Sequence, residues 1–91
     1  MVYESIAVKL QLSPQELERE SLRLFLKHRL RLVESQILDL ARRYNVHTVS
    51  ELDDLVQSGQ IHEDEAFEDY FEFDYLEAER DTLLDSLKEL D

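Results

Sequence analysis

The sequence predicts an all-α protein, an antiparallel hairpin of two long helices plus two short helices, in a single domain of residues 1–91. Three observations predict this fold. The 91 residues include one glycine and one proline, so the chain has almost none of the turn residues that β architectures need. It has no cysteine, which excludes disulfide frameworks and thiol-bound metal sites. Its apolar residues recur at helical spacing along two long segments.

A capping motif marks the start of the first long helix, and a short helix is expected before it. Ser13 can accept a hydrogen bond from the first turn, Pro14 suits the first helical position, and Glu16 can reach back to Ser13. Nothing interrupts the helical pattern that follows, so we expect one helix over residues 13–44, about 48 Å long at 1.5 Å per residue. Before it, apolar residues at helical spacing predict a short helix over residues 3–10.

The second half of the chain repeats this order of a short and a long helix. Thr48 and Glu51 form another capping motif and predict a short helix over residues 48–58. Gly59 ends this helix, because glycine adopts the left-handed conformation at least cost. A last helix is expected over residues 63–90, and the short helix before it makes the reversal between the two long ones.

The two long helices carry matching apolar stripes. In the first, the stripe consists of Leu22, Leu26, Leu30, Val33, Ile37, Leu40 and Tyr44. In the last, it consists of Phe73, Leu76, Leu83, Leu87 and Leu90. We expect these stripes to pack against each other as the core of an antiparallel hairpin.

Each long helix also has apolar residues outside this core. They are Leu17, Leu24, Phe25 and Leu32 in the first, and Phe67, Phe71, Tyr75 and Ala78 in the last. The short helices can cover some of them, and a homodimer or another partner can cover the rest. Since a domain of this size buries only about 60% of its unfolded surface, we expect a homo-oligomer.

The net charge of -12 is concentrated in the second half of the chain. Residues 1–45 carry 8 basic and 6 acidic side chains (+2), whereas residues 46–91 carry 2 basic and 16 acidic ones (-14). Such an acidic field repels nucleic acid and anionic membranes and attracts a basic protein. The alternative is that the acids simply solvate a helical surface.

An acidic and aromatic segment at residues 62–74 is the strongest functional candidate. It has seven carboxylates, four aromatic residues and no lysine or arginine. Rigid aromatic anchors in an acidic rim suit a basic protein surface. The predicted partner-binding residues are Phe67, Glu68, Asp69, Tyr70, Phe71, Glu72 and Phe73. In the alternative interpretation, the acids are there because negative charge is favourable near a helix N-terminus, and the aromatic residues belong to the core.

The sequence offers little for catalysis or for cofactor binding. It has no glycine-rich phosphate loop, no cysteine nucleophile and no recognisable serine–base arrangement. It also lacks the Glu-x-x-His and calcium-loop spacings, and its histidines lie far apart, at His28, His47 and His62. We therefore expect no enzyme, no metal site and no cofactor.

A basic cluster lies in the first half of the helix expected over residues 13–44. It consists of Arg19, Arg23, Lys27, His28, Arg29 and Arg31. Because these residues spread around the helix and alternate with glutamates, pairing with the acidic last helix is favoured over DNA binding. A phosphate backbone in contact with two copies is the alternative. No apolar run suits a membrane span or secretion signal, so a cytoplasmic location is expected.

Several stretches of the sequence have a residue pattern like that of one group of small proteins. They run over Ser5–Leu26 around the first capping motif, Arg43–Val46, Glu51–Leu52 and, most distinctively, Gly59–Asp69. Here the chain resembles small prokaryotic antitoxin-like proteins of two-gene toxin–antitoxin modules. The resemblance implies direct neutralisation of a cognate toxin, often a ribonuclease, and the acidic aromatic helix is the candidate binding element. The ribbon strand or helix-turn-helix that binds operator DNA in known antitoxins has no counterpart here.

Two functions therefore stand as hypotheses. In the first, the protein is a non-enzymatic, antitoxin-like regulator that neutralises a basic partner through its acidic, aromatic C-terminal helix. In the second, it is a structural or adaptor protein that acts as a helical homo-oligomer.

Overall fold

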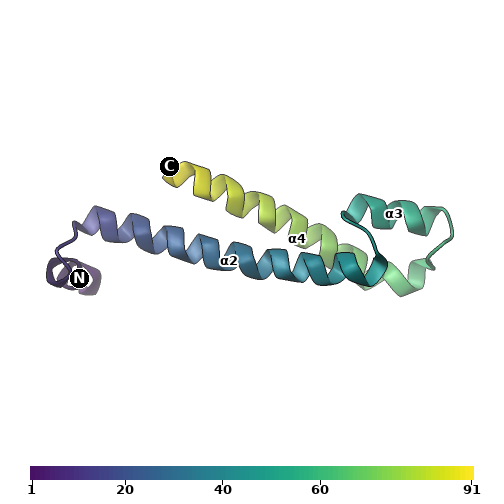
Figure 1. The fold of residues 1–91 in the computed structure, drawn as a ribbon, viewed down its shortest axis with the longest axis horizontal. Helices are drawn as coiled ribbons and strands as arrows, with labels where there is room; N and C mark the ends of the chain where they lie inside the picture. The colour runs from purple at the N-terminus through teal and green to yellow at the C-terminus, as the bar shows by residue number, and fades with distance from the viewer.

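The computed structural model describes residues 1–91 as four helices without strands (Figure 1). They are α1 (Val2–Lys9), α2 (Pro14–Tyr44), α3 (Val49–Gln57) and α4 (Glu63–Leu90). The long helices α2 and α4 run antiparallel, and α3 packs against α4 where the two long helices are joined. The molecule is a rod of 61 × 19 × 18 Å. The predicted all-α hairpin is confirmed.

Side-chain caps set the starts of α2 and α3. The Ser13 hydroxyl accepts a hydrogen bond from the backbone N–H of Glu16 at 3.0 Å, as expected of an N-cap. The Thr48 hydroxyl accepts one from the N–H of Glu51 at 3.1 Å. The Glu51 carboxylate in turn accepts from the N–H of His47 at 2.6 Å, one residue earlier than a capping box requires.

Left-handed residues set the ends of these helices. Asn45, with a φ of 55°, ends α2, and the next N–H, from Val46, donates to the carbonyl of Ala41 at 2.9 Å. Gly59, with a φ of 80°, follows α3. A Cβ atom at Gly59 would meet nothing within 4 Å, so the backbone angle alone favours glycine there.

The core lies where α2, α3 and α4 meet. Its buried members are Val33, Ile37, Leu40, Ala41, Val46, Leu52, Ala66, Phe73, Leu76 and Leu83. Leu52 from α3 and Phe73 from α4 have no exposed surface. Toward the other end of the hairpin, the side chains of the α2 stripe are less buried. Leu26 and Leu30 are half-buried there, and Leu22 is 46% exposed. The apolar stabilisation is therefore concentrated near the connection of the long helices.

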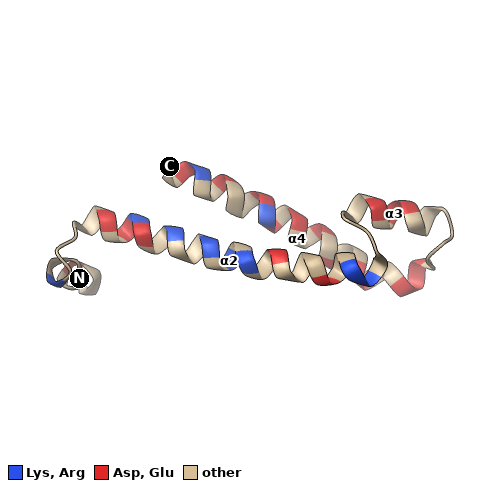
Figure 2. Ribbon diagram, in the orientation of Figure 1, with Lys and Arg blue, Asp and Glu red and all other residues tan.

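Three ion pairs between α2 and the α4 segment hold the two helices in register. Figure 2 shows where basic and acidic residues lie along these helices. They are Arg29–Glu79 at 2.8 Å, Arg43–Asp69 at 2.8 Å and Arg23–Asp91 at 3.1 Å. Exposed pairs of this kind each contribute at most about 1 kcal/mol, so they set alignment more than stability. The predicted pairing of the basic cluster with the last helix is confirmed for Arg23 and Arg29.

The two ends of the rod differ in charge. Residues 32–77, which we call the closed end, carry 2 basic and 13 acidic side chains, a net charge of -11. Residues 1–31 and 78–91, the open end, carry 8 basic and 9 acidic ones, a net charge of -1. Nearly all of the chain's net charge of -12 therefore lies at the closed end.

At the open end, α2 projects beyond α4. The C-terminal Asp91 pairs with Arg23, so the first part of α2 has no partner in α4. Helix α1 packs beside this projection, where Ala7 is buried, but Val2 and Leu10 are 78% and 60% exposed. The short first helix therefore leaves much of the open end apolar and accessible. None of the four helices has the length and apolar character of a membrane span.

Two phenylalanines of α4 provide a test of this core. Replacing the buried Phe73 by alanine should lower the free energy of unfolding by about 3–5 kcal/mol, because it leaves a cavity among α2, α3 and α4. The matched change Phe71→Ala, at a side chain 57% exposed, should cost only about 0.5 kcal/mol. Urea unfolding followed by circular dichroism measures both, and equal losses would contradict this assignment of core and surface.

Candidate partner-binding surface

An exposed aromatic stripe runs along the outer face of α4. Phe67, Phe71 and Tyr75 are 56%, 57% and 64% exposed and follow one another at spacings of one helical turn. At about 100° per residue, this stripe lies on the side of α4 opposite the buried Phe73. The same helix thus buries one aromatic face and presents another to solvent.

Edge-to-face contacts fix the rings of this region. The ring centroids of Phe67 and Phe71 are 5.1 Å apart with an interplanar angle of 75°. Those of Tyr70 and Phe71 are 5.5 Å apart at 89°. Such geometry is favourable for aromatic pairs, so it favours this arrangement of the rings. A surface whose rings already favour one arrangement loses less conformational entropy on binding.

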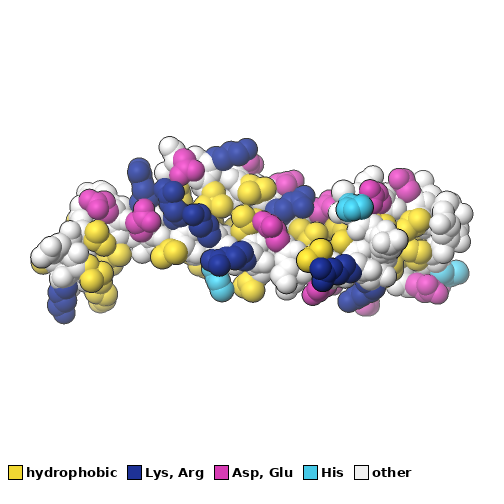
Figure 3. All heavy atoms as spheres, viewed as in Figure 1, with side chains coloured by type: hydrophobic (Ala, Val, Ile, Leu, Met, Phe, Trp, Pro, Cys, Tyr) yellow, Lys and Arg dark blue, Asp and Glu magenta, His cyan; other side chains and the backbone are white.

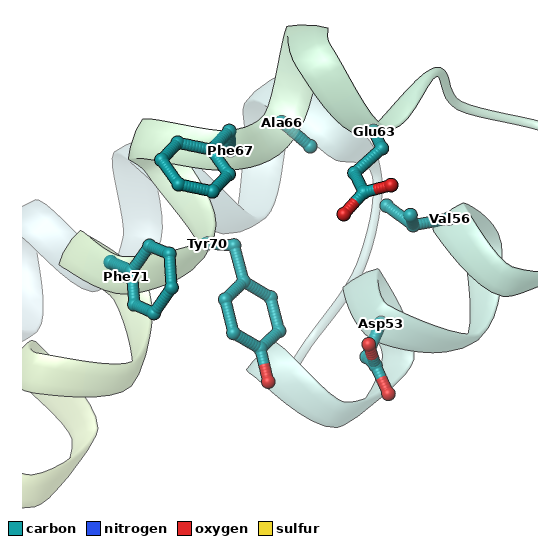
Figure 4. A pocket seen from close by; sticks show the side chains of 7 residues that line it. All are labelled: Asp53, Val56, Glu63, Ala66, Phe67, Tyr70 and Phe71. Carbon is teal, nitrogen blue, oxygen red and sulfur yellow. The ribbon is translucent and has the colours of Figure 1, made fainter.

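A small pocket lies between this stripe and α3 (Figure 4). Its walls are Asp53 and Val56 from α3 and Glu63, Ala66, Phe67, Tyr70 and Phe71 from α4. The carboxylate of Glu63 points toward Val56, and the ring of Tyr70 points across the gap toward α3. The volume of about 190 Å³ is below the roughly 300–1,000 Å³ of small-molecule sites. The pocket is of a size for a single side chain.

The position of α3, and hence this pocket, depends on its contacts with α4. Leu52 is fully buried in the shared core, and Ala66 of α4 is 1% exposed. The backbone N–H of Val49, at the start of α3, donates to the carboxylate of Glu77 at 3.1 Å. The pocket is thus formed by packed helices rather than by a loop.

Asp69 is engaged within the chain. Its carboxylate accepts hydrogen bonds from the Tyr44 hydroxyl and from Arg43 at 2.8 Å. The bond from Tyr44, together with the charge of Arg43, lowers the pKa of Asp69 below its usual value. Burial and the bond to Asp69 raise the pKa of Tyr44 to about 12. Asp69 therefore joins α4 to the end of α2 and is not a free acid for a partner.

The structure corrects the predicted partner-binding set at two residues, Asp69 and Phe73, and divides the rest. Phe73 cannot anchor a partner, because its side chain is fully buried in the core. Tyr70 is half-buried against that core, and only part of its ring reaches the pocket. The sequence had placed Phe73 both in the core stripe and in this set, and the structure confirms the core stripe. Consecutive helical residues point in different directions, so the seven residues cannot share one surface. The accessible members of the set are Phe67, Glu68, Phe71 and Glu72.

Other residues of this surface were outside the predicted set. Tyr75 continues the aromatic stripe, and the helical period had already placed it with Phe67 and Phe71 outside the core, although the partner-binding set did not include it. Asp53 and Val56 come from a different helix, and no local pattern in the sequence connects them with Phe67. Only the packing of α3 onto α4 brings these residues together.

A comparison with known protein families assigns the chain to one of them. A family model described as "Uncharacterized protein MJ0235 family" matches residues 1–91. The chain belongs to the MJ0235 family. No curated protein and no solved structure matches it. The family's description does not mention toxins, so the antitoxin resemblance stays a prediction and the residues of the surface carry the functional conclusion.

The Tyr44–Asp69 bond predicts a characteristic pH dependence of stability. Tyr44→Phe should lower the free energy of unfolding by about 1 kcal/mol at pH 7, because it removes this bond. The folded-state pKa of Asp69 is lowered, so its contribution is present at neutral pH and lost as the pH falls below about 4. The folded-state pKa of Tyr44, about 12, is raised, so its contribution is lost as the pH rises above about 10.

Urea unfolding of both proteins across this pH range measures the difference. The cost of Tyr44→Phe should be largest near neutral pH and should shrink toward both extremes. A cost that does not change with pH would show that the substitution acts through packing alone.

Proposed function

We propose that this chain is a non-enzymatic binding protein that docks a basic protein on the aromatic stripe of α4 and the adjoining pocket. One observation supports this above all others, namely that Phe67, Phe71 and Tyr75 are more than half exposed on a rigid helix at an end with a net charge of -11. Tyrosine and phenylalanine are enriched at the centres of protein interfaces relative to the rest of the surface.

The charge around the stripe selects the partner. Glu68 and Glu72 flank the aromatic rings and make no ion pair within the chain. Acids that lack internal partners remain available to steer a basic surface into contact, an effect that acts mainly on the association rate. The same acids would repel nucleic acid, so a basic protein is the favoured class of partner.

The pocket gives this partner a more specific chemistry. Ala66, Val56 and the aromatic rings can cover the aliphatic stem of a lysine or arginine side chain. Glu63 and Asp53 can then pair with its charged head group, and the ring faces add cation–π attraction. The partner that fits best therefore presents a lysine or an arginine beside an apolar patch.

The resemblance to antitoxin-like proteins gives this binding a biological role. An acidic surface that covers the basic, nucleic-acid-binding face of a ribonuclease would block its substrate by occupancy. Such an antitoxin needs no catalytic residue and no cofactor of its own. The proposed role is neutralisation of a basic toxin of this kind by direct contact.

Recovery of a tagged chain from its own host, with nuclease added, tests this proposal. We expect one basic protein at near-stoichiometric amounts, which is lost as salt rises because part of the attraction is electrostatic. The double change Phe67→Ala and Phe71→Ala should abolish its recovery while the circular dichroism of the helices stays unchanged. The purified pair should dissociate at least about thirtyfold more readily with this variant.

The matched control changes two exposed apolar residues outside both proposed surfaces, Leu38→Ala and Leu84→Ala, which should leave recovery of the basic protein intact. Toxicity of the recovered protein should be suppressed by the wild-type chain and not by the Phe67→Ala, Phe71→Ala variant. Recovery of the chain alone, as a defined oligomer, would contradict the proposal and favour a structural role.

A further inference from the structure

A second apolar stripe lies on α2, on the side away from α4. Leu24, Phe25 and Leu32 are 66%, 63% and 47% exposed, and the half-buried Leu17 extends their line. With Ser21 and His28, they occupy a sector of about 100° that is centred about 150° from the core stripe of α2. We call these six residues the outer α2 stripe. Figure 3 shows hydrophobic side chains along this edge of the open end.

The outer α2 stripe has the symmetry of an antiparallel pair. Leu17 and Leu32 lie at equal distances from the midpoint between residues 24 and 25, and so do Ser21 and His28. Two copies of α2 crossing antiparallel at this midpoint place Leu17 opposite Leu32 and Leu24 opposite Phe25. They also place Ser21 opposite His28, so the two polar members meet each other and no leucine is left against a polar side chain.

The charges beside the stripe agree with this arrangement. Glu20, Lys27 and Arg31 lie on one flank of the outer α2 stripe, at about 100° per residue. In an antiparallel pair with two-fold symmetry, equal flanks face each other. The pairing therefore places Glu20 of each copy midway between Lys27 and Arg31 of the other, about 3 Å along the axis from each.

The other flank follows the same rule. Glu18 and Arg29 lie there, and the antiparallel pair brings each Glu18 within about 3 Å along the axis of the other copy's Arg29. A parallel pair would instead bring unlike flanks together, with Glu18 beside Glu20 and Arg29 beside Lys27 and Arg31. Like charges would then face each other, which opposes a parallel dimer.

Most of these flanking charges have no partner within the chain. Glu18, Glu20, Lys27 and Arg31 make no ion pair, whereas Arg29 already contacts Glu79. The open end that carries them has a net charge of only -1, so two copies meet there with little repulsion. Two closed ends in contact would bring together two net charges of -11, which repel each other. The charge distribution thus favours self-association through α2 and opposes it through α4.

We propose that two copies of this chain form an antiparallel, two-fold symmetric dimer through the outer α2 stripe, with the axis between Leu24 and Phe25. Helix α1 lies on the side of α2 away from α4 in Figure 1, and its Tyr3 lies close to Leu17 and Ser21. A second copy on this side therefore contacts α1 as well as α2. The two aromatic stripes of α4 stay free in this dimer. Each dimer thus presents two separate surfaces for the basic partner.

Disulfide cross-linking tests both the register and the direction of the dimer. The chain has no cysteine, so the variants Ser21→Cys and His28→Cys each carry a single thiol. After mixing and mild oxidation we expect a covalent dimer that contains one chain of each variant, because the two positions face each other. Each variant alone should cross-link poorly, since the Ser21 positions of two antiparallel copies lie about 10 Å apart along the axis.

Cross-linking of Ser21→Cys with itself as efficiently as in the mixture would indicate a parallel pair and overturn the proposal. A dimer that yields no mixed product under the same conditions would overturn this register. Sedimentation equilibrium gives the independent measurement. The wild-type chain should dimerise, and a chain that stays monomeric at about 100 μM, where a micromolar dimer is nearly complete, would overturn the proposal outright.

Matched charge insertions separate the two exposed surfaces. Phe25→Asp should raise the dimer Kd by at least about tenfold, since both copies lose an apolar anchor. Phe71→Asp, at a phenylalanine of similar exposure on α4, should leave the dimer Kd unchanged. Both variants should keep the wild-type helical circular dichroism because both side chains are exposed. Weakening of the dimer by Phe71→Asp and not by Phe25→Asp would move the interface to α4 and overturn the proposal.

Discussion

The burial of Phe73 and Leu52 in one core with residues of α2 is the interaction on which the rest of the structure depends. Of the fully buried side chains, these two are the largest, and they come from α4 and α3. Both belong to one buried cluster that also contains residues of α2, and this cluster joins three helices at one place. Because the remaining contacts between α2 and α4 are half-buried leucines and exposed ion pairs, this cluster carries most of the apolar stabilisation.

This single core also decides what is left exposed. An α-helix that buries one side against a hairpin partner turns its opposite side to solvent, and a two-helix layer has no third element to cover it. In α4 the opposite side is aromatic and surrounded by acids, whereas in α2 it is aliphatic and flanked by charges of both signs. The two free sides therefore differ in chemistry, and they suit partners of different kinds.

The sequence was most informative where a local rule applies. The caps at Ser13 and Thr48 and the left-handed Gly59 were predictable because each depends on residues within one helical turn. The two apolar stripes of the hairpin were predictable from the helical period alone. These features account for the order and the boundaries of the helices, and hence for the fold class.

The division of the acidic aromatic segment into core and surface was predicted only in part. The helical period placed Phe73 in the core stripe and Phe71 outside it, as the structure confirms, yet the predicted partner-binding set also included Phe73. The bond between Tyr44 and Asp69 joins residues of different helices, so it follows from the hairpin register and not from any motif. For the same reason, the contribution of Asp53 to the pocket depends on where α3 packs.

The separation of charge along the rod has a further consequence for how the protein responds to its surroundings. At physiological ionic strength the Debye length is about 8 Å, whereas the molecule is 61 Å long. A body near one end therefore senses almost nothing of the charges at the other. Charges near the two tips of the rod therefore act almost independently, so a change of charge at one tip has little effect on how fast a partner associates at the other.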